Sequence, residues 1–186
     1  MRALALILVP ILVLSGCAAV VAPLLPAYRD TSVTIASKAD FDPARYAGLW
    51  HEVARFPVPF QSGCPRATAE YTAPDAAGEI RLRNTCRDAD GAALRAITGR
   101  AETIGPGRLR VSLSGVPFAA PLWVLWTDAD YRTAVLGQPD GRAGWILNRD
   151  PEIPPDRLAA ALTVLDFNGY DTGALIYAPA VQKPLE

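Results

Sequence analysis

The stretch from Gly48 to Phe56 constrains the fold most, because its pattern favours an extended strand. In steps of two, one face of that strand carries Trp50, Glu52, Ala54 and Phe56, and the other carries Leu49, His51, Val53 and Arg55. Gly48 has no side chain, so the backbone can bend there or be approached closely. A large aromatic residue two positions after such a glycine suits the floor of a closed β-barrel. A generic edge strand with a buried tryptophan fits the same residues.

Composition narrows the class of protein. The 186 residues suit one domain, since domains usually have ~100–200 residues, and 17 prolines with 14 glycines favour many turns between short strands. A net charge of −1 gives no argument for a nucleic-acid partner. The single histidine excludes a catalytic site built on several histidines and a metal site with two histidine ligands. We predict no metal site and no cofactor.

The first 16 residues have the features of a signal peptide. Arg2 supplies a positive charge, and residues 3–14 form an apolar run shorter than the ~20 residues that a membrane-spanning helix needs. Leu14-Ser15-Gly16-Cys17 then resembles the lipobox of bacterial lipoproteins, in which the cysteine becomes the first mature residue and carries a diacylglyceryl group. The alternative is an ordinary secretory signal cut near Ala18.

A lipidated Cys17 would determine where the protein resides. Each buried methylene contributes ~0.8 kcal/mol, so two or three acyl chains would anchor the chain stably. Ala18 follows the cysteine, which in lipoproteins implies sorting to the outer membrane. We therefore expect an outer-membrane protein facing the periplasm. Residues 17–38 are predicted to form a lipidated tether, and residues 39–186 the folded domain.

Cys64 and Cys86 remain after lipidation, and in an oxidising periplasm two such cysteines often pair. Residues 66–71 and 79–85 indicate the two arms of a hairpin. A turn centred near Asp75 would place Cys64 opposite Cys86, which favours a disulfide. Two separate buried thiols are the alternative.

Turn signals divide the domain into eight short strands, at residues 48–56, 66–71, 79–85, 93–103, 108–113, 121–127, 131–137 and 143–148. No helix separates them, so an antiparallel up-and-down meander is expected, and eight strands can close into a barrel that holds one small ligand. A helix from Pro155 to Asn168 has one apolar stripe and should lie outside the barrel. Residues 174–177 form a short final strand at an edge.

Three sequence blocks, in order, resemble the motifs of the lipocalins, in particular the bacterial outer-membrane members of the apolipoprotein D-like group. They are Gly48-Leu49-Trp50, Thr127-Asp128-Ala129-Asp130-Tyr131 and Asn148-Arg149-Asp150. The resemblance spans residues 40–180 and implies an all-β, eight-stranded calyx. It also implies that Arg149 lies across the indole of Trp50 and closes the base of the barrel. The residues that close the fold, and bind no ligand, would be Gly48, Trp50, Asp130, Tyr131 and Arg149.

A barrel closed at one end leaves an apolar mouth and wall for a ligand. The candidate ligand-binding residues are Glu52, Phe56, Phe60, Tyr71, Val111, Leu113, Phe118, Trp123 and Trp126. Both faces of strand 121–127 are apolar, so the sequence leaves open which of its two tryptophans points inward, and each aromatic residue could equally belong to ordinary core. A buried Glu52 would be paired with an arginine or hold a polar ligand head, and we favour the pairing. His51 should face outward, which argues against haem ligation.

The resemblance implies a binding protein. It would hold a fatty acid, a lysophospholipid or another small hydrophobic ligand, for membrane maintenance or lipid storage, and would touch the membrane through its anchor. Two alternatives are an enzyme acting on a lipid in the calyx and a scavenger of haem or pigment. Cys64 is the one candidate thiol for an enzyme, and the disulfide explains it better. No nucleic acid is expected, and the protein could be a monomer or a dimer.

Overall fold

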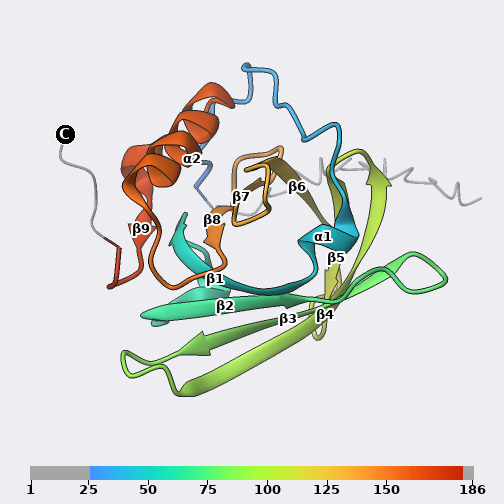
Figure 1. The fold of residues 1–186 in the computed structure, drawn as a ribbon, viewed down its shortest axis with the longest axis horizontal. Coiled ribbons are helices and arrows are strands. Elements are labelled where there is room, and N and C mark those ends of the chain that lie inside the picture. Colours follow the sequence, from blue (N-terminus) through green and yellow to red (C-terminus); the bar gives the residue numbers. More distant parts are fainter. Residues whose placement is uncertain (1–25, 182–186) are drawn as a thin grey trace, which may run out of the picture.

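The computed structural model describes residues 26–181, and these form a closed antiparallel barrel (Figure 1). The sheet has the strand order β2-β3-β4-β5-β6-β7-β8-β1-β9, and β2 also pairs with β1, which closes the ring. The strands are β1 (Gly48–Arg55), β2 (Arg66–Tyr71), β3 (Glu79–Arg87), β4 (Ala93–Gly105), β5 (Arg108–Leu113), β6 (Ala120–Thr127), β7 (Thr133–Gly137), β8 (Gly144–Asn148) and β9 (Ile176–Tyr177). The predicted all-β, eight-stranded, up-and-down barrel is confirmed, with β9 added at β1.

Within residues 26–181, two helices and two short 3₁₀ turns accompany the barrel: α1 (Pro43–Tyr46), α2 (Pro155–Phe167), η1 (Pro59–Gln61) and η2 (Thr172–Ala174). Asp42 caps α1, because its carboxylate accepts hydrogen bonds from the backbone N–H groups of Ala44 and Arg45. Figure 1 shows α2 against the outside of the barrel, as the sequence predicts. No described helix is long and apolar enough to cross a membrane.

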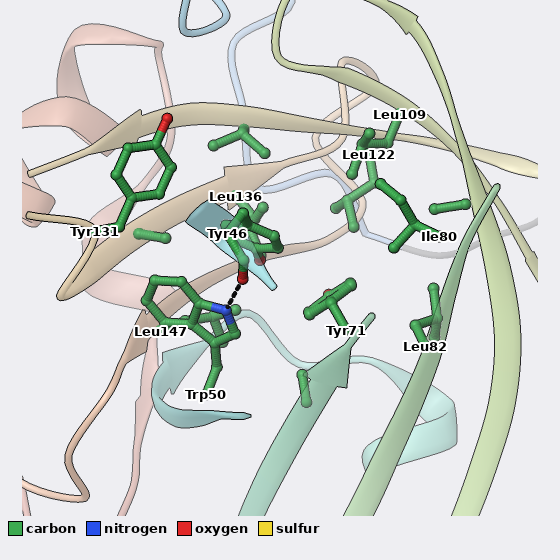
Figure 2. Packing of buried hydrophobic residues seen from close by; sticks show 14 residues of the cluster. Tyr46, Trp50, Tyr71, Ile80, Leu82, Leu109, Leu122, Tyr131, Leu136 and Leu147 are labelled. Carbon is green, nitrogen blue, oxygen red and sulfur yellow. Dashed lines mark hydrogen bonds between the residues drawn. The ribbon is translucent and has the colours of Figure 1, made fainter. Parts of the chain in front are cut away.

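The apolar residues divide into two buried clusters, one on each side of the barrel wall. The interior cluster includes Tyr46, Trp50, Tyr71, Ile80, Leu82, Leu109, Leu122, Leu136 and Leu147 (Figure 2). The second cluster, here called the outer core, joins the outer face of the wall to α2 and includes Val53, Phe56, Leu125, Val135, Ile146, Leu158, Ala161 and Leu165. Strands β6, β7 and β8 are therefore apolar on both faces.

A β-bulge in β1 changes the face on which its last residues lie. The pairing of β1 with β8 shifts register between Glu52 and Ala54. A bulge inserts one residue and so reverses the alternation beyond it. Trp50 and Glu52 face the interior, as expected, but Ala54 and Phe56 belong to the outer core.

The segment before the barrel is part of the fold from about residue 28, so the predicted tether of residues 17–38 extends too far. Tyr28 stacks on Phe56 with ring centroids 5.1 Å apart. The Arg29 side chain is buried and donates to the backbone oxygens of Asn168, at 2.7 Å, and Pro139, at 3.0 Å. Residues 28–38 thus form a strap across the outside of the barrel. The predicted signal peptide and Cys17 lie outside the described residues.

Candidate functional site

The barrel encloses a cavity of about 340 Å³. Its deep wall is apolar and consists of interior residues of several strands, among them Ala69, Tyr71, Leu82, Leu122, Leu136 and Leu147. Its mouth lies between η1, the loop after β5 and the turn between β7 and β8, which contribute Phe60, Phe118 and Ala143. Phe60 and Phe118 are 44% and 77% exposed, so they form the rim rather than the core.

The base of the barrel is closed by Trp50 and Arg149. The guanidinium carbon of Arg149 lies 3.7 Å from the centroid of the Trp50 ring, a cation–π contact. The guanidinium also donates to the backbone oxygens of Leu49, at 2.8 Å, and Ala47, at 2.9 Å. Trp50 Nε1 donates to the oxygen of Tyr46 at 2.8 Å, as Figure 2 shows. One charged side chain therefore ties the start of β1 to the end of β8.

Gly48 is required by this closure. Its φ is +103°, a conformation that residues with a side chain rarely adopt, and a Cβ there would lie 3.1 Å from Arg149 Nη1. Tyr131 is also strained, with φ +55°, and its hydroxyl accepts a hydrogen bond from the N–H of Asp42 at 2.8 Å. Both residues therefore take part in closing the base, in agreement with the roles expected for them.

The carboxylate that holds the turn before β7 is that of Asp128, and not that of Asp130, which was expected among the fold-closing residues. Asp128 Oδ1 accepts hydrogen bonds from the N–H groups of Arg132, at 2.7 Å, and Thr133, at 2.6 Å. Asp130 is exposed, and its side chain forms no hydrogen bond or ion pair among the described residues. The Asp-x-Asp sequence contains two carboxylates that could bind the turn. In the folded turn, Asp128 is the one that accepts hydrogen bonds from the backbone N–H groups of Arg132 and Thr133.

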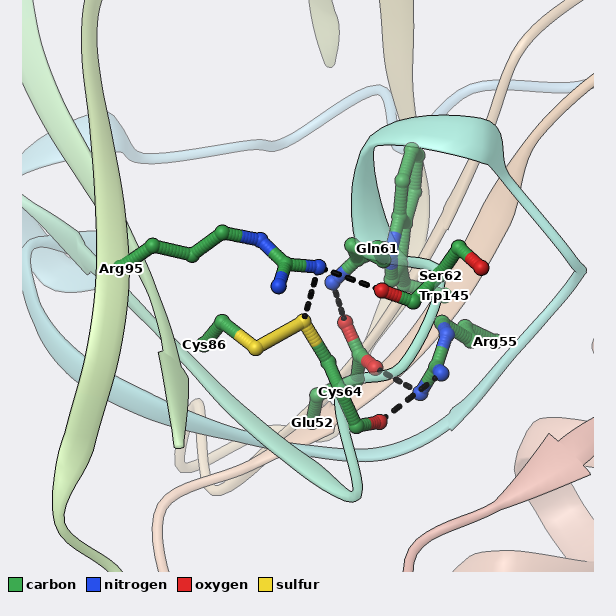
Figure 3. Close-up of a disulfide and its surroundings, with 8 residues drawn as sticks. All are labelled: Glu52, Arg55, Gln61, Ser62, Cys64, Cys86, Arg95 and Trp145. Carbon is green, nitrogen blue, oxygen red and sulfur yellow. Dashed lines mark hydrogen bonds and ion pairs between the residues drawn. A yellow bond between two sulfur atoms is a disulfide. The ribbon is translucent and has the colours of Figure 1, made fainter. Parts of the chain in front are cut away.

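A polar cluster interrupts the apolar wall near the mouth (Figure 3). Glu52 Oε1 accepts from Arg55 Nη1 at 2.8 Å, and Glu52 Oε2 accepts from Gln61 Nε2 at 2.6 Å. Trp145 Nε1 donates to Gln61 Oε1 at 3.0 Å. Burial raises the pKa of Glu52 above its usual value, although the charge of Arg55 opposes that shift. The favoured pairing of Glu52 with an arginine inside the barrel is confirmed.

The structure places six of the nine candidate ligand-binding residues on the cavity. These are Glu52, Phe60, Tyr71, Val111, Leu113 and Phe118, and their contact with a ligand stays a prediction.

The other three candidates, Phe56, Trp123 and Trp126, do not line the cavity, so their assignment to it is wrong. Phe56 lies beyond the bulge of β1 and is fully buried in the outer core. In β6 the inward residues are Leu122 and Val124, so both tryptophans pack outside the wall. Trp123 lies beneath Arg108, whose guanidinium carbon is 4.4 Å from its ring centroid.

Several cavity residues were not anticipated from the sequence. Trp145 and Leu147 are two positions apart on β8, and both face the cavity. The two-residue alternation of a strand could have predicted that they share a face. Asn84 of β3 also lines the cavity, and its buried Oδ1 has no hydrogen-bond partner among the described residues. Gln61 sits in a proline-flanked loop, where no sequence pattern indicates that its amide reaches Glu52 and Trp145.

A family model described as a lipocalin-like domain matches residues 41–180. The chain belongs to the lipocalin family.

Curated relatives of this lipocalin include bacterial and animal proteins. The outer membrane lipoprotein Blc of Escherichia coli (strain K12) is 34% identical over 148 residues, which cover 78% of this chain and 81% of that protein. Apolipoprotein D of Mus musculus is 29% identical, covering 71% of this chain and 73% of that protein. The predicted apolipoprotein D-like grouping is therefore confirmed. Insecticyanin from the tobacco hornworm Manduca sexta has a TM-score of 0.61 at 22% identity over 82% of this chain and 86% of its own, a likeness of fold alone.

This lipocalin contains the predicted disulfide, which joins Cys64 to Cys86 with Cα atoms 5.4 Å apart. The register differs from the expected one, because Ala67 and not Cys64 lies opposite Cys86 in the β2–β3 ladder. Cys64 reaches its partner from the loop after η1 (Figure 3). A bridge across 22 residues contributes about 3 kcal/mol in the chain-entropy model. It also fixes the loop that borders the mouth.

The described residues contain no cluster of three or more histidine, cysteine, aspartate or glutamate side chains that could hold a metal ion.

Proposed function

We propose that this lipocalin is an outer-membrane-anchored carrier of small hydrophobic or amphiphilic ligands of the fatty-acid or lysophospholipid class. The observation that supports the proposal is the cavity of about 340 Å³, which lies within the ~300–1,000 Å³ range of small-molecule sites. Its deep wall is apolar, and the polar side chains that also line the cavity include Glu52, Gln61, Asn84, Gln138 and Arg142. An apolar chain placed there gains ~25 cal/mol for each Å² removed from water.

The polar groups near the mouth suit an amphiphile. The acyl chain would occupy the apolar depth beside Leu122 and Leu136, and the polar head would lie near Glu52, Gln61 and Asn84. The unpartnered oxygen of Asn84 could accept a hydrogen bond from such a head, which would remove the cost of leaving it unpaired. A ligand with one apolar and one polar end therefore matches this cavity better than a pure hydrocarbon.

The membrane location rests on the sequence and on the relatives. The matched Blc proteins are, by name, outer membrane lipoproteins, and this chain has Leu-Ser-Gly-Cys directly after an apolar run. An anchor keeps the cavity at a high effective concentration of membrane lipid. A role in membrane maintenance or lipid storage would follow from that proximity.

A catalytic role is less well supported. Cys64, the thiol that an enzyme could have used, is bonded to Cys86 and so is not a nucleophile in this state. We propose a binding protein without catalysis.

Filling the cavity should abolish ligand binding. Ala120 lines the cavity at the start of β6, so Ala120→Trp places an indole where the ligand would lie. Native mass spectrometry after exposure to palmitate or a lysophospholipid should show the bound lipid in the wild type and at least about tenfold less in the variant.

Ala119→Trp is the matched control, because Ala119 is the preceding residue, is exposed and does not line the cavity. This variant should bind as the wild type does. Equal binding by both variants, or a wild type that takes up neither lipid, would contradict the carrier proposal. Uptake of haem or a pigment in place of lipid would favour the scavenger alternative.

The anchor is tested separately. Cys17→Ser removes the sulfur that would carry the lipid, and the protein should then be lost from the outer-membrane fraction. Ser15→Ala, which leaves the cysteine in place, is the control. Retention of Cys17→Ser in the outer membrane would show that the anchor lies elsewhere.

A further inference from the structure

A second hollow, of about 260 Å³, lies on the barrel surface outside the ligand cavity. Its wall includes the outward residues at the pairing of β1 with β2, the end of β3 and the segment after β9. The side chains relevant here are His51, Arg66, Thr68 and Arg87, with Ala178 and Ala180 along one edge. The positive charge of this hollow has no explanation in the fold or in the proposed carrier function.

Two arginines face one another across the ladder in this hollow. Arg66 of β2 and Arg87 of β3 are directly opposed in register. Like charges in that position destabilise a sheet. Neither arginine forms an ion pair among residues 26–181, and the buried Nε of Arg66 has no hydrogen-bond partner there. A buried, unpaired donor of a charged group carries a desolvation cost that an anion would remove.

Hydrogen bonds within the protein hold the side chain of Arg87 in place in this hollow. Arg87 is fixed, since its Nε donates to Thr68 Oγ1 at 3.3 Å and its Nη1 donates to the oxygen of Gly91 at 2.9 Å. His51 is opposite Thr68 in the β1–β2 register. The one described histidine therefore lines the same hollow as Arg66 and Arg87, and the charge of Arg87 reaches it.

Two carboxylates near the hollow, those of Asp150 and Glu52, are engaged with other arginines. Asp150, whose charge reaches His51, forms an ion pair with Arg132. Glu52 contributes to the same hollow, but its carboxylate points into the barrel and pairs with Arg55. The net charge of the hollow is therefore positive.

We propose that this hollow is an anion site that binds a phosphate group between Arg66 and Arg87. Guanidinium groups bind phosphate oxygens in pairs with fixed geometry, and two of them opposed across a ladder can clasp one tetrahedral anion. The phosphate could come from free inorganic phosphate or from the headgroup of a phospholipid. Arg87 ends β3 and Arg66 begins β2, and Leu49, His51 and Pro151 line the same hollow, so the site lies on the outer wall beside the start of β1.

His51 is the chain's only histidine and is a built-in probe of the site. Burial lowers its pKa, the charge of Asp150 raises it and the charge of Arg87 lowers it. A bound anion would favour the imidazolium form, so the pKa of His51 should rise when phosphate binds. The experiment is an NMR titration of ¹³C-histidine-labelled full-length protein, without a histidine tag, in a nonionic detergent and at constant ionic strength.

Inorganic phosphate should produce a saturable shift of the His51 ring signal. Arg66→Gln should weaken the apparent affinity by about tenfold, because one charge-assisted hydrogen-bonded group is lost. Arg81→Gln is the matched control, since Arg81 is on β3 but exposed and away from the hollow. A shift that does not saturate, or one that is the same in Arg66→Gln as in the wild type, would overturn the proposal.

A second titration with dihexanoyl-phosphatidylglycerol distinguishes the two sources of phosphate. A response to this lipid that Arg66→Gln weakens assigns the site to headgroups, and a response to inorganic phosphate alone assigns it to the free anion. A response to neither overturns the proposal. Ala120→Trp should respond as the wild type does, so the outcome is independent of whether the cavity carries lipid.

Discussion

Trp50→Ala is expected to lower the free energy of unfolding by about 3–5 kcal/mol, the range for deleting a fully buried large aromatic side chain. Trp50 is 0% exposed and lies at the base of the barrel. Its removal leaves a void beside Tyr46, whose ring centroid is 4.9 Å from that of Trp50. It also removes the aromatic face against which Arg149 stacks. The guanidinium keeps its backbone acceptors but loses the surface that orients it.

Chemical denaturation measures this effect, and Trp123→Ala is the control. Trp123 is half-buried on the outer wall, so its loss should cost clearly less. A double-mutant cycle with Arg149→Ala isolates the contact, which is expected to contribute about 0.5–2 kcal/mol. Additive effects of the two substitutions would show that the stacking contributes nothing, and a loss under about 1 kcal/mol for Trp50→Ala would contradict the closing role.

Arg55→Met should lower the free energy of unfolding by about 3–5 kcal/mol at neutral pH, because it leaves Glu52 buried without its ion-pair partner. The side chains of Glu52 and Arg55 are only 6% and 8% exposed, so water compensates neither charge. Arg55 Nη2 also donates to the oxygen of Cys64 at 3.1 Å, and that bond to the loop at the mouth is lost as well.

The effect of Arg55→Met should depend on pH in a defined direction. Burial raises the pKa of Glu52 in the folded protein above its unfolded value, so the folded state binds this proton more tightly. Stability from this group is then highest below the unfolded pKa and falls as pH rises through the folded pKa. Without Arg55 the folded pKa rises further, because the opposing charge is gone. The variant should therefore lose less stability near pH 4 than at pH 8.

Urea unfolding at a series of pH values measures this dependence. Arg100→Met is the control, since the Arg100 side chain is 70% exposed and its loss should change stability by no more than about 0.5 kcal/mol. The double variant Glu52→Gln with Arg55→Met should recover part of the loss at high pH, because no charge then remains buried. An Arg55→Met penalty that is equal at both pH values would mean that Arg55 does not change the pKa of Glu52 in the folded protein.

Local patterns in the sequence were sufficient for most of the architecture. Alternation between turn residues gave the eight strands, and a single apolar stripe placed α2 outside the barrel. The resemblance of the blocks around Trp50 and Arg149 to lipocalin motifs implied the closed base, and the contact between these two side chains agrees with it. The strands and the helix depend on residue type and spacing within short segments, which is the information that one sequence contains.

Tertiary packing decided which side of the wall each residue occupies where both sides are apolar. In β6 one face packs toward α2 and the other lines the barrel interior, so both faces carry apolar residues. The sequence of β6 therefore does not show which face points inward, and only the structure placed Trp123 and Trp126 outside the wall. The bulge after Glu52 moved Phe56 outward, and a one-residue insertion in the ladder has no signature in the alternation itself. The strap at residues 28–38 depends on contacts with segments far away in the chain, such as the hydrogen bond from Arg29 to Asn168. The opposition of Arg66 and Arg87 depends on the register of β2 and β3, which the whole barrel determines.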